Sequence, residues 1–145
     1  MKHARQTIRE AVITLLGGIS GVTLERSRVY PMVSLPVISV YANGEVSESE
    51  NESMPSPLRY SRRLQLQIDI AVDGVTGFDD TVDDYAAQVE AALAADLTLG
   101  DTATDSMLTR TTIDMDGSGD TPIAIARLQY EVWYRTTGTD PENNI

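Results

Sequence analysis

The segment from Arg62 to Val72 constrains the fold of this chain more than any other stretch. Its aliphatic residues share one parity, and they are Leu64, Leu66, Ile68, Ile70 and Val72. Because side chains of a β-strand alternate between faces with a period of two, this pattern predicts a strand with a dry face and a polar face that carries Gln65, Gln67 and Asp69. Fully burying each aliphatic side chain is worth about 1.5–3 kcal/mol, so we expect this strand in the core. A polar second face is typical of an antiparallel sheet covered on one side only.

Helical and strand patterns elsewhere complete an α+β arrangement. Apolar residues at helical spacing predict helices over Ala4–Leu16 and Thr81–Leu97. Thr81 and Asp84 resemble a capping box at the start of the second helix. Short apolar runs predict further strands at Val37–Tyr41, Met107–Met115 and Ile123–Arg135. We therefore predict a single α+β domain over residues 1–145, with a mostly antiparallel β-sheet and two helices packed on one face.

Residues 43–58 have a different composition from the segments on either side. Asn43-Gly44 is a turn signal. It is followed by serines, prolines and the glutamates Glu45, Glu48, Glu50 and Glu52. So little apolar surface cannot repay the entropy of ordering, which predicts a flexible acidic loop at about 43–58, with a long β-arm as the alternative. The polar residues 138–145 are likewise expected to form a loose C-terminal tail.

Composition excludes several classes of function. The chain has no cysteine and one histidine, His3, which we expect in a frayed N-terminus, so thiol catalysis and multi-histidine metal sites are not expected. The N-terminus does not resemble a signal peptide, and no apolar run approaches the ~20 residues of a membrane span, so we expect a soluble protein that folds in a cytosol. The net charge of −11 argues against phosphate-driven nucleic-acid binding.

Two acidic clusters are weak candidates for metal or acid–base sites. The run from Asp114 to Asp120 begins like a calcium loop, but Ile125 stands where the bidentate glutamate belongs, which favours a glycine-rich hairpin turn. The acids around Asp79–Asp84 are better explained by the preference for negative charge at a helix N-terminus. We therefore expect no catalytic residue, no metal site and no cofactor.

Trp133 is the most informative aromatic residue. It shares the polar parity of the last strand with Arg127, Gln129, Glu131 and Arg135. It is either tucked under a loop or serves as an anchor in a subunit interface, where tryptophan is enriched. Arg62 and Arg63 are either solvated charges at a strand entry or partners for a neighbouring subunit's glutamates. The candidate interface residues are Glu45, Glu48, Glu50, Glu52, Arg62, Arg63 and Trp133.

The order of these segments resembles the tail terminator proteins of long-tailed bacteriophages. The resemblance rests on the N-terminal helix, the run Arg28-Val-Tyr-Pro with Leu35-Pro-Val-Ile-Ser-Val-Tyr41, the acidic insertion and the strand Leu64–Val72. The helix Thr81–Leu97 and the closing strand Arg127-Leu-Gln-Tyr-Glu-Val-Trp-Tyr134 complete it. It covers about Ile8–Arg135.

The resemblance implies a structural virion protein rather than an enzyme. Such proteins form a ring, usually a homo-hexamer, that caps the tail tube at its head-proximal end, stops its polymerisation and meets the head–tail connector. Its partners would be further copies of itself, the tail tube protein and the connector, with assembly in the host bacterial cytoplasm. DNA would pass through the channel without specific binding, and no membrane would be involved. Two alternatives stay open: another connector or tail-tube component of similar fold, and a small metal- or ligand-binding α+β enzyme.

Overall fold

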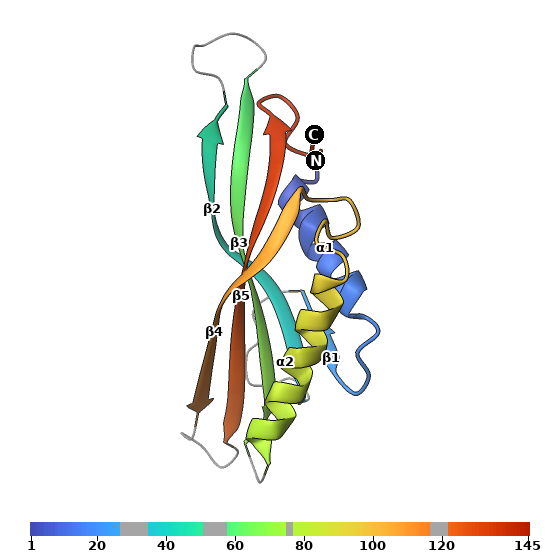
Figure 1. Ribbon diagram of the computed structural model, residues 1–145, viewed down its shortest axis with the longest axis vertical. Coiled ribbons are helices and arrows are strands. Elements are labelled where there is room, and N and C mark those ends of the chain that lie inside the picture. The colour runs from blue at the N-terminus through green and yellow to red at the C-terminus, as the bar shows by residue number, and fades with distance from the viewer. Residues whose placement is uncertain (27–34, 51–57, 75–76, 117–121) are drawn as a thin grey trace.

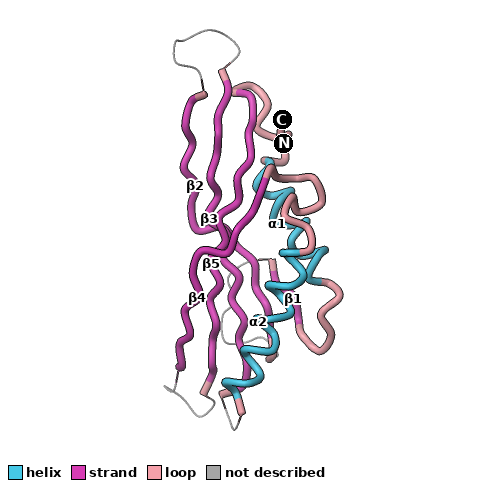
Figure 2. The backbone as a smooth tube through the Cα atoms, in the orientation of Figure 1, coloured by secondary structure: helices cyan, strands magenta, loops and turns pink. Residues whose placement is uncertain are grey.

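The fold is a twisted five-stranded sheet with both helices on one face, as Figures 1 and 2 show. The computed structural model describes residues 1–26, 35–50, 58–74, 77–116 and 122–145. The elements follow in the order α1 (Ala4–Leu16), β1 (Thr23–Glu25), β2 (Val37–Ser49), β3 (Arg59–Asp73), α2 (Phe78–Ala94), β4 (Asp105–Asp116) and β5 (Ile123–Thr137). The strand order is β1-β2-β3-β5-β4, and only the short β1–β2 pair is parallel. The predicted α+β class is confirmed.

The core lies between the sheet and the helix pair, and β3 runs through its centre. Its five aliphatic side chains are at most 2% exposed. They meet the alternating buried set of β5, which is Ala124, Ala126, Leu128, Tyr130, Val132 and Tyr134. In α1, Ile8, Val12 and Leu16 are fully buried at the spacing of one helical face. The dry face of β3 is confirmed.

The polar face of β3 differs from the prediction at one residue. Gln65 is exposed, but Gln67 is only 8% exposed. The Gln67 Nε2 donates to the Tyr41 hydroxyl at 2.6 Å and to Asp69 Oδ1 at 2.9 Å, and its Oε1 accepts from Asn43. Neighbouring polar side chains therefore cover Gln67, and its amide is satisfied by them rather than by solvent.

Two helix signals were interpreted incorrectly. Helix α2 begins at Phe78 rather than Thr81, because Gly77 adopts φ 80° and serves as the N-cap without a side-chain bond. Thr81 lies inside the first turn, where its Oγ1 donates to the Gly77 carbonyl at 3.1 Å. His3 is not frayed, because its Nδ1 accepts from the Arg5 backbone N–H at 3.2 Å and caps α1.

The predicted loop at 43–58 is largely a β-arm. Strand β2 continues to Ser49 and pairs with β3 down to Tyr60, with a register shift between Ala42 and Gly44 in place of the predicted turn. This hairpin extends beyond the helices at one end of the molecule (Figure 1). The rest of the predicted loop falls largely on residues 51–57, which lie outside the described residues. The alternative of a long β-arm is the correct one for Glu45–Ser49.

The C-terminal tail packs back onto the fold and is not loose. The Ile145 N–H donates to the Arg135 carbonyl at 2.9 Å, and the Ala4 N–H donates to the Pro141 carbonyl at 2.8 Å. The two termini consequently lie side by side (Figure 1). Among the described residues, no helix is long and apolar enough to cross a membrane.

Candidate functional site

Glu45 of β2 contacts three other elements of the same chain. Its carboxylate accepts from Arg5 of α1 at 2.8 Å, from Arg62 of β3 at 3.2 Å, and from the Tyr134 hydroxyl of β5. Its side chain is only 10% exposed and that of Arg62 only 13%. Burial, followed by the bond to Glu45, raises the pKa of Tyr134 above its ordinary value. Glu45 and Arg62, two of the predicted interface residues, thus have partners inside the chain.

The remaining arm residues are more accessible. The Glu48 side chain is 69% exposed and lies 3.5 Å from Arg63, which also approaches Glu131 at 3.6 Å. Glu50 accepts from Arg135, and this bond holds the pKa of Glu50 below its usual range. Glu52 lies outside the described residues. Arg63 therefore contacts glutamates of its own chain, and an intersubunit role for these residues stays a prediction.

Trp133 lies half-buried on the uncovered face of the sheet. Register places it between Arg63 on β3 and Asp105 on β4. Its ring lines a hollow of about 310 Å³ with further lining residues Ser61, Thr104, Tyr134 and Arg135. No loop of the described chain hydrogen-bonds its indole, so an interface role for Trp133 stays a prediction.

The edge strand β4 and the segment after α2 share an apolar surface that was not predicted from the sequence. Leu97 and Met107 are 49% and 54% exposed beside a groove of about 380 Å³ between the end of α2 and β4. Further along the strand, Ile113 and Met115 face the helix side but are 52% and 50% exposed. The alternating apolar residues in Met107–Met115 were a signal for this surface, but they equally predicted a core strand.

In the described part of the chain, neither edge of the sheet is covered by a further strand, and the two edges differ from each other. β4 is the last strand on one side, so its outer backbone groups face away from the sheet. On the other side, β1 is the edge strand, and among the described residues it pairs with β2 along Val37–Ser39. Open edges present backbone donors and acceptors that another strand can pair with.

The polar residues at the centre of the uncovered face contact one another. Arg127 is engaged by Asp114 and lies 4.0 Å from Asp69, while Gln67 is held by its neighbours. Among the described residues, no group of three or more His, Cys, Asp or Glu side chains is arranged to hold a metal ion. Part of the calcium-like run, residues 117–121, lies outside the described residues. The best-developed features of the described surface are therefore its edges and grooves.

No protein-family model and no curated protein sequence match this chain. Among solved structures, it is similar to a chain described as "Virion of native gene transfer agent (GTA) particle". The two chains are 14% identical over 90% of this chain and 92% of the other, with a TM-score of 0.32.

Proposed function

We propose that this chain is a structural protein of a phage tail that forms a closed ring, caps the tail tube and ends its polymerisation. The resemblance to tail terminators over Ile8–Arg135 supports the assignment to this class of protein. In that role the ring sits at the head-proximal end of the tail, between the tube protein and the head–tail connector. It is a virion component rather than an enzyme.

The observation that carries the proposal is the pair of unlike open edges. An assembly in which the β4 side of one copy meets the β2 side of the next is heterologous, so each copy uses two different surfaces. Heterologous contacts repeat around an axis and close into a ring when the rotation per copy divides a full turn. Such a ring fits a protein that limits a polymer better than a twofold dimer does.

The exposed apolar side chains on β4 and in the segment after α2 support the same arrangement. Apolar surface gains about 25 cal/mol per Å² when it is removed from water. In the isolated chain Leu97 and Met107 remain about half exposed beside their groove. A neighbouring copy that covers this groove would bury them.

Charge supports a passive role toward DNA. The chain carries 22 acidic and 11 basic residues, so a ring of six has a net charge of about −66. Nucleic-acid binding needs clustered cations that neutralise phosphates. A strongly acidic channel lets DNA pass without holding it.

Mass in solution is the first test. Six copies of 15.8 kDa give about 95 kDa by light scattering, and electron microscopy should show closed rings. A chain that stays at 15.8 kDa at all accessible concentrations contradicts the proposal. Open tubes of indefinite length would favour the alternative of a tail-tube component.

Phage assembly is the second test. A phage that lacks this protein should produce tails of excessive length, or tails that do not join heads, and expression of the chain in trans should restore normal particles. Normal particles without the protein would exclude a terminator role.

A further inference from the structure

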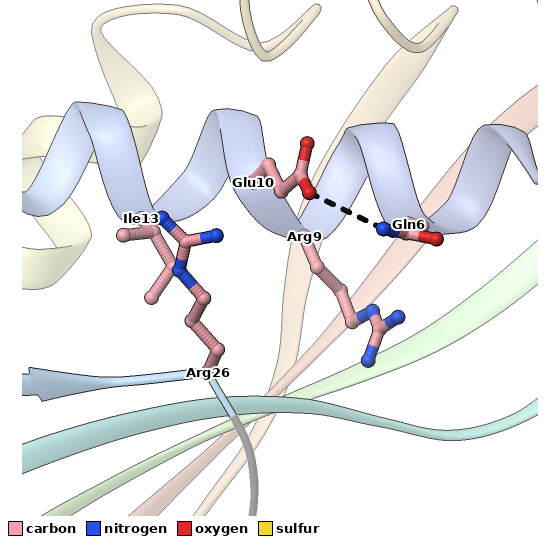
Figure 3. Close-up of a pocket in the computed structure, with 5 residues that line it drawn as sticks. All are labelled: Gln6, Arg9, Glu10, Ile13 and Arg26. Carbon is pink, nitrogen blue, oxygen red and sulfur yellow. Dashed lines mark hydrogen bonds between the residues drawn. The ribbon is translucent and has the colours of Figure 1, made fainter. Parts of the chain in front are cut away.

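A cationic pocket lies between α1 and the end of β1, on the side of the molecule opposite to β4. It has a volume of about 180 Å³ and is lined by Gln6, Arg9, Glu10 and Ile13 of α1 and by Arg26. Figure 3 shows Arg9 descending from the helix toward the strands while Arg26 rises beside Ile13. Two guanidinium groups therefore line one small pocket.

Neither arginine forms an ion pair with the described residues, although the charge of Arg26 reaches Glu10, whose pKa is lowered first by its bond to Lys2 and last by Arg26. Within the described residues, neither Arg9 nor Arg26 forms a hydrogen bond or an ion pair, and the Arg9 Nε is buried with no acceptor. The ion pairs of the described chain use Lys2, Arg5, Arg62, Arg63, Arg127 and Arg135. A buried donor without an acceptor is costly, and no acceptor of the described chain satisfies the Arg9 guanidinium.

Glu10 does not supply an acceptor for the Arg9 guanidinium. Its carboxylate is engaged by Lys2 and accepts from the Gln6 amide at 3.4 Å. Figure 3 shows its carboxylate directed toward Gln6, while the Arg9 guanidinium points toward the strands. The pocket therefore has unused capacity for a carboxylate, which is the group that guanidinium binds with two parallel hydrogen bonds.

The opposite side of the molecule carries acids that lack a cation. Glu90 and Asp105 are exposed and line the groove beside β4 together with Leu97 and Met107. Neither forms an ion pair with the described residues; Asp105 only accepts from the adjacent Ser106 N–H at 2.9 Å. Because β1 and β4 are the two ends of the strand order, a head-to-tail contact brings this acidic groove toward the arginine pocket of the next copy.

We propose that the pocket of Arg9 and Arg26 is a carboxylate site that is filled by Glu90 or Asp105 of a second copy of this chain. The inference rests on the proposed ring and adds the ion pairs that set its direction. Opposite charges on the two unlike surfaces favour the head-to-tail contact, whereas like charges oppose contacts between two identical surfaces.

A charge exchange in trans tests this pairing. Arg9→Glu with Arg26→Glu, and separately Glu90→Arg with Asp105→Arg, should each reduce the mass from about 95 kDa toward 15.8 kDa. Mixing the two double variants should restore closed rings, because an alternating ring again pairs opposite charges at every contact. Thr81→Glu, an exposed position in the first turn of α2 that lines neither the pocket nor the groove, is the control that should keep the ring.

Restoration on mixing cannot be explained by misfolding, since each variant must be folded to complement the other. Rings that persist in both double variants overturn the inference but leave the proposed function intact. A wild-type chain that forms no ring overturns the proposed function itself. Loss of rings without restoration on mixing overturns the assignment of Glu90 and Asp105 as the carboxylates that fill the arginine pocket.

A small carboxylate tests the pocket without any ring. The Glu90→Arg, Asp105→Arg variant leaves the arginine pocket empty, so sodium acetate should raise its melting temperature relative to sodium chloride at equal ionic strength. The rise should vanish when Arg9→Gln and Arg26→Gln are added. An unchanged melting temperature in acetate overturns the carboxylate site. If acetate raises the melting temperature but mixing the two double variants does not restore rings, the pocket binds a free small anion. The inference that a second copy supplies the carboxylate is then overturned.

Discussion

At the scale of single residues, the polar network around Gln67 determines how the uncovered sheet face is built. Sequence alternation correctly placed Gln65 and Gln67 on one face but did not distinguish them. The difference arises from β2, because Tyr41 and Asn43 lie beside Gln67 and bond to it. Which polar residues of two strands become neighbours depends on register, and the register of β2 against β3 changes at the bulge after Ala42.

The two glutamines therefore form a matched pair for mutation. Gln67→Ala should lower the free energy of unfolding by about 1–3 kcal/mol, because it removes a buried amide and leaves the groups that bonded to it without a partner. Gln65→Ala should stay within about 0.5 kcal/mol, since its side chain is exposed. Urea denaturation measures both, and equal losses would contradict the special role of Gln67.

His3 gives a pH dependence that belongs to one residue. Burial, and then the nearby charge of Arg5, lowers the pKa of His3 below its ordinary value of 6.5. Glu45 opposes this shift and Arg62 adds to it. Only the neutral ring accepts the Arg5 N–H that caps α1.

The sign of the effect follows from linkage. The unfolded chain binds a proton at His3 more readily than the folded chain does, so this contribution to stability is complete above pH 6.5 and declines as the pH falls through the lower folded pKa. The melting temperature should drop between pH 7.5 and pH 5. His3→Asn, which keeps a capping side chain, should flatten that part of the profile. An identical profile in the variant would show that other groups cause the drop.

At the scale of elements, ion pairs stabilise the outer part of the β2–β3 hairpin, which the hydrophobic pattern of the sequence did not predict. The first helix was predicted with its correct bounds because its apolar periodicity is local. The β-arm was not favoured because Glu45–Ser49 offers almost no apolar area. Its backbone pairs with β3, and its glutamates pair with arginines that are distant in sequence, notably Arg62 and Arg135. Such pairings become apparent only once the strands are aligned.

Substitutions of two glutamates of β2 compare the loss of a buried contact with the loss of a surface charge. Glu45→Ala should cost about 2 kcal/mol, because Arg62 and Tyr134 would keep their buried positions without an acceptor. Glu48→Ala should change stability by less than about 0.5 kcal/mol, since its ion pair with Arg63 is exposed. Thermal melts at pH 7 compare the two variants. Equal effects would show that the Glu45 contacts do not organise the arm.

At the scale of the whole molecule, the proposed assembly uses the edges of the sheet rather than its faces. The sequence predicted the strands and the single covered face, but strand order could not be read from it. That order decides that β4 lies at one edge and the short β1 at the other. The exposed apolar groups of β4 and the arginine pocket beside β1 acquire a common interpretation only when they are seen on opposite sides of one sheet.

Met107 provides the test of that interpretation at the scale of the assembly. It is 54% exposed, so Met107→Glu should change the stability of the isolated chain by no more than about 0.5 kcal/mol. If a neighbouring copy covers the groove, each contact in the ring loses apolar burial and gains a carboxylate next to Glu90 and Asp105. Every 1.4 kcal/mol lost is about a tenfold weaker contact, so the concentration needed for ring formation should rise at least tenfold.

The assembly measurement needs a control of the same charge. Ser20→Glu adds one carboxylate at an exposed position after α1, away from the groove of β4. Light scattering over a dilution series should show rings for the Ser20 variant at wild-type concentrations and smaller species for the Met107 variant. Circular dichroism melts of both should coincide with the wild type within the range expected for surface changes. Rings of unchanged stability in Met107→Glu would mean that copies meet elsewhere, because the facing pocket offers two arginines to the two acids of the groove and a third carboxylate would be buried without a partner.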